Sequence, residues 1–150
     1  MIRTMAMAAA LLCAGTAQAQ LSVVTGPVEA DVIRTVDGDT LKLAVYAWTD
    51  ELRLVDLRLR GVDTPEVRGA CSYEKDLAQA AKRFTADLIA KSNNRVKLYV
   101  IGCNASEGAG FGRCLSYVHA GGVDISKALI DAGLARRNFG EKRQPWCPAP

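Results

Sequence analysis

The chain has 150 residues, of which 19 are Lys or Arg and 16 are Asp or Glu, so its formal net charge at pH 7 is +3. This length is enough for one domain with a sizeable core, and so mild a charge does not by itself indicate a nucleic-acid-binding protein. The apolar run near the N-terminus is far shorter than the ~20 residues that a membrane-spanning helix needs. We therefore expect one globular domain and no membrane association.

The first 19 residues have the pattern of a secretory signal peptide. Arg3 supplies an early positive charge, residues 5–14 are apolar, and the sequence AQA at residues 17–19 is a small-x-small cleavage signal. We expect cleavage near Ala19 and export to the periplasm or the medium. The remaining residues, 20–150, then form the single domain.

Three strands are predicted in the first half of that domain. Residues 28–35 are moderately β-prone, and residues 40–46 alternate apolar and polar side chains. The Asp-Gly turn between these two segments predicts a hairpin. Residues 52–61 form the third strand, in which Arg58 lies on the face opposite the core leucines.

The second half predicts two helices and two further strands. An amphipathic helix spans residues 72–90, with Ser72 as its expected N-cap. Strands follow at residues 95–101 and 113–119, and Asp124 is the expected cap of a second helix. No repeat or domain linker interrupts this order.

Five short strands bury little apolar surface as a flat sheet, but a closed barrel of the same strands has no long exposed edge. The predicted fold class is therefore α+β, mainly β. Within it we expect a five-stranded antiparallel OB-fold (oligonucleotide-binding) barrel with two or three packed α-helices. A two-sheet sandwich is the alternative.

Four cysteines follow the predicted signal peptide, and an even number in an exported chain predicts two disulfides. A zinc site is the competing use, but no two of these cysteines are separated by two residues and the chain has one histidine. Three pairings are possible. We favour Cys103 with Cys114, which flank a glycine-rich loop, and Cys71 with Cys147, which would tie down the C-terminal tail.

Two corners of the chain concentrate carboxylates at strand ends. Asp37 and Asp39 lie in the hairpin turn, whereas Asp63 and Glu66 follow the third strand, which carries Arg58 shortly before its end. If the corners meet in space, they form an acidic site with a guanidinium beside it. Each corner taken alone is better explained as a polar turn, so evidence for a functional site must come from the rest of the chain.

Four segments together resemble the thermonuclease family, the staphylococcal-nuclease-like phosphodiesterases. They are DGDT (37–40), RLRGVDTPE (58–66), FGRCLSYV (111–118) and ISKALIDAGLAR (125–136). DGDT alone is a weak motif, whereas DTPE after an Arg-bearing strand, followed later by Gly-Arg at the start of another strand, is specific. The resemblance covers roughly residues 31–139.

The resemblance implies a bound Ca²⁺. Asp39 and Asp63 would supply carboxylate oxygens to the ion, Thr64 would add its backbone carbonyl, and Asp37 would lie close by as an additional acid. Two carboxylates, a carbonyl and water suit a hard cation that takes six to eight oxygen ligands.

The resemblance also implies the catalytic residues. Glu66 would orient or deprotonate the attacking water, and Arg58 and Arg113 would bind the scissile phosphate through their fork-shaped donors. Considered apart from the motifs, Arg58 and Arg60 are best explained as side chains on a solvated strand face. This remains our interpretation of Arg60. In the family the substrates are DNA and RNA, cut with little regard for sequence to leave 3′-phosphates.

The sequence departs from the family pattern at two aromatic positions. Phe111 and Phe139 stand where the best-known member has tyrosines that contact substrate, so hydroxyl hydrogen bonds are lost while stacking on bases persists. Downstream is a basic cluster, for which contact with a nucleic-acid backbone and a solvated tail are equally good interpretations. Its members are Arg136, Arg137, Lys142 and Arg143.

The sequence thus predicts an exported, monomeric, Ca²⁺-dependent endonuclease that hydrolyses DNA and RNA. A non-catalytic nucleic-acid-binding barrel and a secreted Ca²⁺-binding module are the alternatives. All the Asp, Glu and Arg positions of the implied site are present, whereas a degenerate copy would be expected to have lost at least one.

Overall fold

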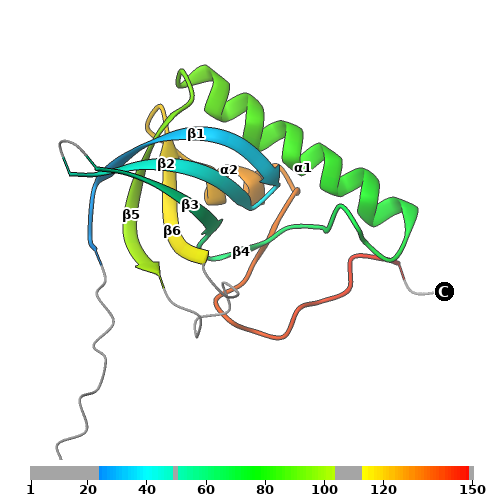
Figure 1. Ribbon diagram of the computed structural model, residues 1–150. Coiled ribbons are helices and arrows are strands. Elements are labelled where there is room, and N and C mark those ends of the chain that lie inside the picture. Colours follow the sequence, from blue (N-terminus) through cyan, green and yellow to red (C-terminus); the bar gives the residue numbers. More distant parts are fainter. Residues whose placement is uncertain (1–23, 49–50, 104–112, 149–150) are drawn as a thin grey trace, which may run out of the picture.

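The computed structural model describes residues 24–48, 51–103 and 113–148 (Figure 1). The predicted signal peptide and Phe111 lie outside the described residues. The elements are β1 (Val28–Asp37), β2 (Thr40–Trp48), β3 (Glu51–Leu59), β4 (Val62–Asp63), α1 (Ser72–Lys91), β5 (Arg95–Cys103), β6 (Arg113–Ala120), β7 (Val123–Asp124), α2 (Ile125–Asp131) and β8 (Arg136–Arg137). No helix in this part of the chain is both long enough and apolar enough to cross a membrane.

The five long strands close into a barrel, as predicted, and the fold is consistent with an OB-fold. The sheet order is β3-β2-β1-β5-β6, with the short β7 beside β6, and an additional pairing of β3 with β6 completes the ring. This closing pair is parallel, with Leu57 beside Cys114. The expectation of a purely antiparallel barrel was wrong at this seam, because a ring with an odd number of strands cannot have only antiparallel neighbours.

The barrel interior is filled by leucines from neighbouring strands. Leu41 and Leu43 of β2 and Leu57 and Leu59 of β3 are essentially inaccessible to solvent. Full burial of such a side chain contributes about 1.5–3 kcal/mol. The helix α1 lies along one side of the barrel (Figure 1), and its buried face includes Ile89 of the same core. The alternation within β3 therefore fixes which face of the strand is left for Arg58.

The two helices begin differently. The side chain of Asp124 accepts a hydrogen bond from the Lys127 backbone N–H at 3.1 Å, so the predicted cap of α2 is confirmed. The prediction for α1 was wrong by one residue, since Cys71 is the N-cap and Ser72 is already helical. A disulfide fixes Cys71 in extended backbone geometry at this position, and its side chain makes no capping hydrogen bond.

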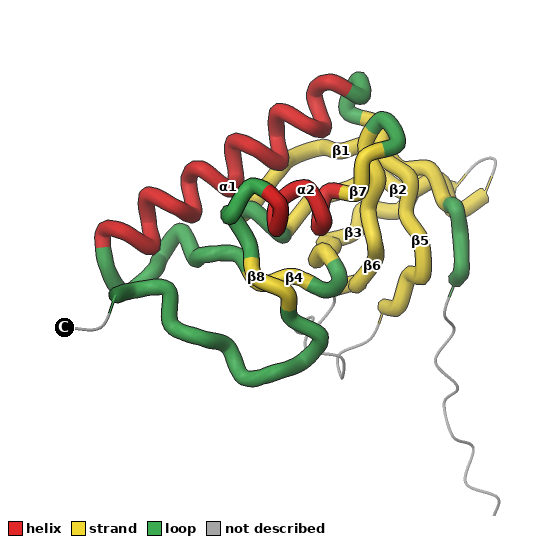
Figure 2. Tube along the Cα trace, turned by 180° about the vertical axis from the view of Figure 1, so that it is seen from behind, coloured by secondary structure: helices red, strands yellow, loops and turns green. Residues whose placement is uncertain are grey.

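Both favoured disulfides are present. Cys103–Cys114 joins the neighbouring strands β5 and β6. Cys71–Cys147 connects the start of α1 to the C-terminal segment across a sequence separation of 76 residues. In the chain-entropy account, a crosslink closing so long a loop stabilises the fold by ~4 kcal/mol. The segment after β8 therefore runs back to the beginning of α1 (Figure 2), next to the β4 corner.

Candidate active site

The two acidic corners meet beneath α1. The Thr85 hydroxyl of α1 donates a 2.8 Å hydrogen bond to the Gly38 carbonyl in the β1–β2 turn. A Cβ on Gly38 would come within 2.8 Å of the Ala81 side chain and 3.1 Å of the Thr64 methyl. Only glycine allows the turn, the helix and the β4 corner to approach this closely. The helix thereby places the turn that carries Asp37 and Asp39 against the corner that carries Asp63.

Arg58 joins the two corners. Its Nη2 lies 2.9 Å from Asp39 Oδ2 and 3.8 Å from Asp63 Oδ1. Both carboxylates are buried, with Asp39 only 4% exposed. The structure therefore brings together three of the residues predicted from sequence, with one guanidinium nitrogen between two acidic groups.

The β1–β2 turn carries the carboxylates of Asp37 and Asp39, and the positive groups of the protein compensate their negative charge only in part. Asp37 Oδ1 is a buried oxygen without a hydrogen bond among the described residues, and the buried Asp39 Oδ2 has the ion pair with Arg58 as its contact. Burial raises the pKa of Asp39, and Arg58 and Thr40 counteract this only in part. Burial, together with the charges of Glu66 and Asp39, also raises the pKa of Asp37. Buried carboxylates whose pKa values are raised make a favourable site for a cation.

The donor set suits a hard cation. Asp39, Asp63 and the carbonyl of the buried Thr64 are all oxygen donors, and none is soft. No group of three or more His, Cys, Asp or Glu side chains within the described ranges is arranged to hold a metal ion. A site of two carboxylates, one carbonyl and water does not need a third side chain. The residues present thus fit an ion such as Ca²⁺.

Glu66 follows Asp63 at the same corner and is held by a residue that the sequence did not assign to the site. Arg143, in the segment after β8, places Nη1 2.7 Å from Glu66 Oε1. Its Nη2 donates to the Thr64 carbonyl at 3.0 Å, and its Nε lies 3.4 Å from Asp63 Oδ2. Hydrogen bonding to Glu66 and the charge of Asp63 outweigh partial burial and raise the pKa of Arg143.

Glu74 is a second residue whose role sequence reasoning missed. In a predicted helix its place in the first turn indicates only a favourable interaction with the helix dipole. In the structure its buried carboxylate accepts backbone hydrogen bonds from Ala70 at 2.9 Å and Glu66 at 3.3 Å. Gly69 leaves the room for this, because a Cβ there would lie 2.5 Å from Glu74. Glu74 therefore fixes the loop between the β4 corner and α1.

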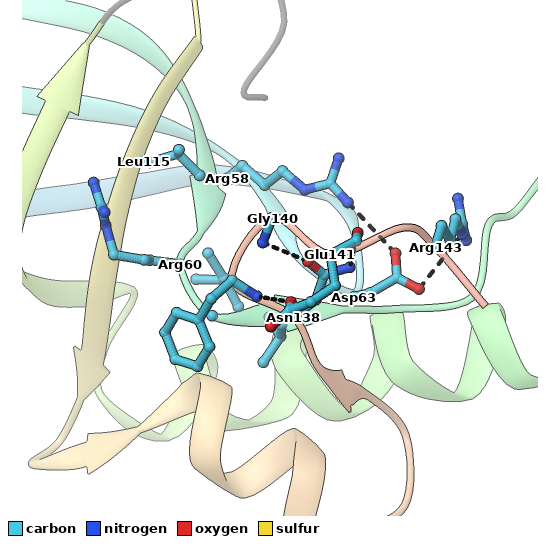
Figure 3. Close-up of a pocket in the computed structure, with 12 residues that line it drawn as sticks. Arg58, Arg60, Asp63, Leu115, Asn138, Gly140, Glu141 and Arg143 are labelled. Atoms are coloured by element: carbon cyan, nitrogen blue, oxygen red, sulfur yellow. Dashed lines mark hydrogen bonds and ion pairs between the residues drawn. The ribbon is translucent and has the colours of Figure 1, made fainter. Parts of the chain in front are cut away.

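A cleft opens beside these groups (Figure 3). It has a volume of about 730 Å³ and is lined by Arg58, Asp63 and Arg143, among others. Phe139, which is 55% exposed, forms part of its wall against Gly61. Figure 3 shows the Asp63 carboxylate between Arg58 and Arg143, with each guanidinium directed at it.

Arg113 lies on the same barrel face, one strand away. In the parallel β3–β6 pairing Arg58 is opposite Leu115, and Arg113 precedes Leu115 by two residues. Alternate residues of a strand share a face, so Arg113 and Arg58 project to the same side. Arg113 is exposed at the start of β6, and it is not among the residues that line the cleft.

Comparison with known proteins shows the family of the chain. The model of the family described as staphylococcal nuclease homologue matches residues 56–146, which include the end of β3, the β4 corner and Arg143. The chain belongs to the staphylococcal nuclease homologue family. The resemblance predicted from the sequence motifs is thereby confirmed.

Two curated relatives place the chain within that family. A thermonuclease from Staphylococcus intermedius is 32% identical over 108 residues, which cover 72% of this chain and 58% of the relative. The SPbeta prophage-derived endonuclease YokF from Bacillus subtilis is 28% identical over 109 residues, or 73% of this chain and 34% of the relative. The chain thus spans a third to somewhat over half of the relatives it matches.

The burial of Asp39 leads to a prediction about stability in this nuclease homologue. Because the folded-state pKa of Asp39 is raised above its ordinary value of 3.8, the ionised form opposes folding at neutral pH. Stability should therefore rise as pH falls through the folded-state pKa. Asp39→Asn, measured by thermal melting in chelator at pH 7, should melt a few degrees higher than the parent, and it should lose any stabilisation by Ca²⁺.

Asp56→Asn is the matched control, since Asp56 is an exposed carboxylate of β3 paired with Lys42. This control should change neither the melting temperature in chelator nor the response to Ca²⁺ appreciably. If Asp39→Asn melts below the parent in chelator, the ion pair with Arg58 outweighs the burial of the charge and the prediction is wrong.

Proposed function

We propose that this chain is a Ca²⁺-dependent phosphodiesterase, an endonuclease that hydrolyses DNA and RNA with low sequence specificity. One observation carries the proposal: the β1–β2 turn and the β4 corner place Asp39 and Asp63 on the same guanidinium nitrogen of Arg58. Glu66 lies at the same corner, three residues after Asp63. A carboxylate pair, an adjacent guanidinium and a further acid are the groups that phosphodiester hydrolysis requires.

The proposed cofactor site consists of Asp39, Asp63 and the Thr64 carbonyl, with Asp37 nearby. When bound, Ca²⁺ would supply Lewis-acid polarisation of the phosphate and neutralise part of its charge. The burial of Asp39, the raised pKa values of Asp37 and Asp39, and the buried Asp37 Oδ1 without a hydrogen bond among the described residues support a cation at this place. Arg58 would share the carboxylates of Asp39 and Asp63 with the ion.

The protein groups then have separate tasks. Arg58 and Arg113 would donate hydrogen bonds to the non-bridging oxygens of the scissile phosphate from neighbouring strands of one barrel face. Glu66 would accept a proton from the attacking water, or hold that water in line with the phosphorus. Phosphoryl transfer depends mainly on positioning and charge stabilisation, which fits a site held by rigid strands and a helix.

The relatives support this proposal in the words of their names, endonuclease and thermonuclease. We extend it to 3′-phosphate products, to a monomeric protein, and to export directed by residues 1–19. Two disulfides in the described part of the chain support an oxidising compartment such as the periplasm or the medium.

The deciding experiment uses the purified, oxidised protein with 5′-labelled single-stranded DNA and RNA. We expect cleavage in Ca²⁺, none in chelator, and products whose mobility changes on removal of a 3′-phosphate. Glu66→Gln purified in the same way controls for contaminating nuclease. Binding without cleavage in Ca²⁺ at high protein concentration would overturn the proposal and favour a non-catalytic nucleic-acid-binding barrel.

A further inference from the structure

We infer that Arg143 is a positioning residue for the proposed reaction, which it serves by fixing Glu66 and the Thr64 carbonyl. The inference rests on the proposed function, because Glu66 is the group that would handle the attacking water. Arg143 reaches this corner from a segment 77 residues further along the chain than Glu66. Its contacts are therefore a product of the tertiary structure.

All three nitrogens of the Arg143 guanidinium are directed at the protein. Nη1 contacts Glu66, Nε contacts Asp63, and Nη2 lies 3.0 Å from the Thr64 carbonyl and 3.5 Å from Glu74. A planar guanidinium engaged on every side holds its partners in a defined geometry. By comparison, Arg58 contacts Asp39 and Asp63 through a single nitrogen, Nη2.

The C-terminal segment is built to place Arg143. Trp146 is 7% exposed, and its Nε1 donates to Asp63 Oδ2 at 3.1 Å. Arg136 covers the Trp146 ring with its guanidinium 3.8 Å from the ring centre, and it donates to the Pro145 carbonyl at 3.0 Å. Cys147 then binds the segment covalently to the start of α1. These contacts offset the entropy of ordering an extended segment that has few hydrogen bonds of its own.

The contact with Glu66 has a direct chemical consequence. Arg143 engages Oε1 of the Glu66 carboxylate, whose side chain is 45% exposed even with Arg143 in place. With Oε1 fixed, Oε2 is left at a defined place for the proposed water. Loss of a residue that orients a reacting group typically lowers activity about 10- to 100-fold. A displacement of the reacting group by about 1 Å has an effect of similar size.

Arg143 also competes with a cation for the same corner. It places a positive charge beside Asp63 and donates to the Thr64 carbonyl, both of which we assign to the Ca²⁺ site. Removing it should therefore tighten Ca²⁺ binding while slowing turnover. A purely structural role predicts the opposite for binding, because a disordered corner would hold the ion less well.

The test compares Arg143→Ala and Arg143→Lys with the parent protein in its oxidised form. Arg83→Ala is the matched control, because it removes an exposed arginine side chain of α1 to which we assign no role. The measurements are kcat and KM on single-stranded DNA, Ca²⁺ affinity by calorimetry without substrate, and melting temperature. Free guanidinium at low millimolar concentration, against NaCl of equal ionic strength, tests chemical rescue of the alanine variant.

We expect kcat of Arg143→Ala to fall about 10- to 100-fold with a smaller change in KM, and the Kd for Ca²⁺ to fall about tenfold. Guanidinium should restore part of kcat, Arg143→Lys should be intermediate, and Arg83→Ala should match the parent. Unchanged kcat would overturn the inference, as would faster turnover, which would indicate that Arg143 blocks the site. Weaker Ca²⁺ binding together with a lower melting temperature would show that the role of Arg143 is structural instead. A parent protein that cleaves nothing would refute the proposed function itself.

Discussion

Glu66→Gln is expected to lower turnover roughly 10²- to 10⁴-fold while Ca²⁺ affinity stays close to that of the parent. The carboxylate is the group that would accept the proton of the attacking water, and an amide cannot. Gln keeps the size of the side chain and an oxygen that can still accept a hydrogen bond from Arg143. The measurement is single-turnover cleavage of a labelled oligonucleotide at saturating Ca²⁺, together with calorimetry for the ion.

The matched control for this variant is Glu51→Gln, an exposed glutamate at the start of β3 that pairs with Arg53. It should cleave at the parent rate. If Glu66→Gln also cleaves at the parent rate, Glu66 has no part in the chemistry. If its Ca²⁺ affinity falls along with its rate, Glu66 belongs to the ion-binding set and the separation of roles made above is wrong.

Arg58→Ala is expected to lower kcat about 10³-fold, because the variant lacks a charge-assisted donor to the phosphate in the transition state. A second effect should accompany the first. Without Arg58, the buried Asp39 and Asp63 lose the guanidinium that lies between them, so the variant should melt below the parent in chelator. Ca²⁺ should then raise the melting temperature of the variant more than that of the parent.

Arg53→Ala tests whether these effects are specific, since Arg53 is on the same strand but is exposed and paired with Glu51. Its kcat and melting temperatures should stay near those of the parent. Arg58→Lys should recover little of the rate, because an ammonium group lacks the fork-shaped pair of donors. Equal stabilisation of Arg58→Ala and the parent by Ca²⁺ would show that Arg58 and the ion do not share the carboxylates.

Much of the site could be predicted from sequence because its residues lie in short motifs. Asp39 is in a hairpin turn, Asp63 and Glu66 follow a strand, and the alternation of β3 already placed Arg58 away from the core. The distances between residues of one motif are fixed by local backbone geometry. Local backbone geometry does not determine that the two corners meet, because their contact depends on Gly38 fitting against α1.

The residues that sequence reasoning missed lie outside those motifs. Arg143 belongs to a basic cluster for which a solvated tail was an equally good interpretation, and Glu74 had an adequate explanation in the helix dipole. One feature of the sequence could have pointed to Arg143. The favoured Cys71–Cys147 bridge places the C-terminal segment next to the loop after Glu66, so a cation in that segment was a candidate partner for the acidic corner.

The sequence by itself determined the strand and helix order, the family and the acidic and basic residues of its motifs, and it favoured the cysteine pairing that the structure has. These follow from periodicity, turn chemistry and motif order, all of which are properties of neighbouring residues. Only the tertiary structure decided the parallel seam between β3 and β6 and the position of Arg143 on Glu66. Both depend on contacts between segments distant in the chain, and local preferences do not determine which distant partners will meet.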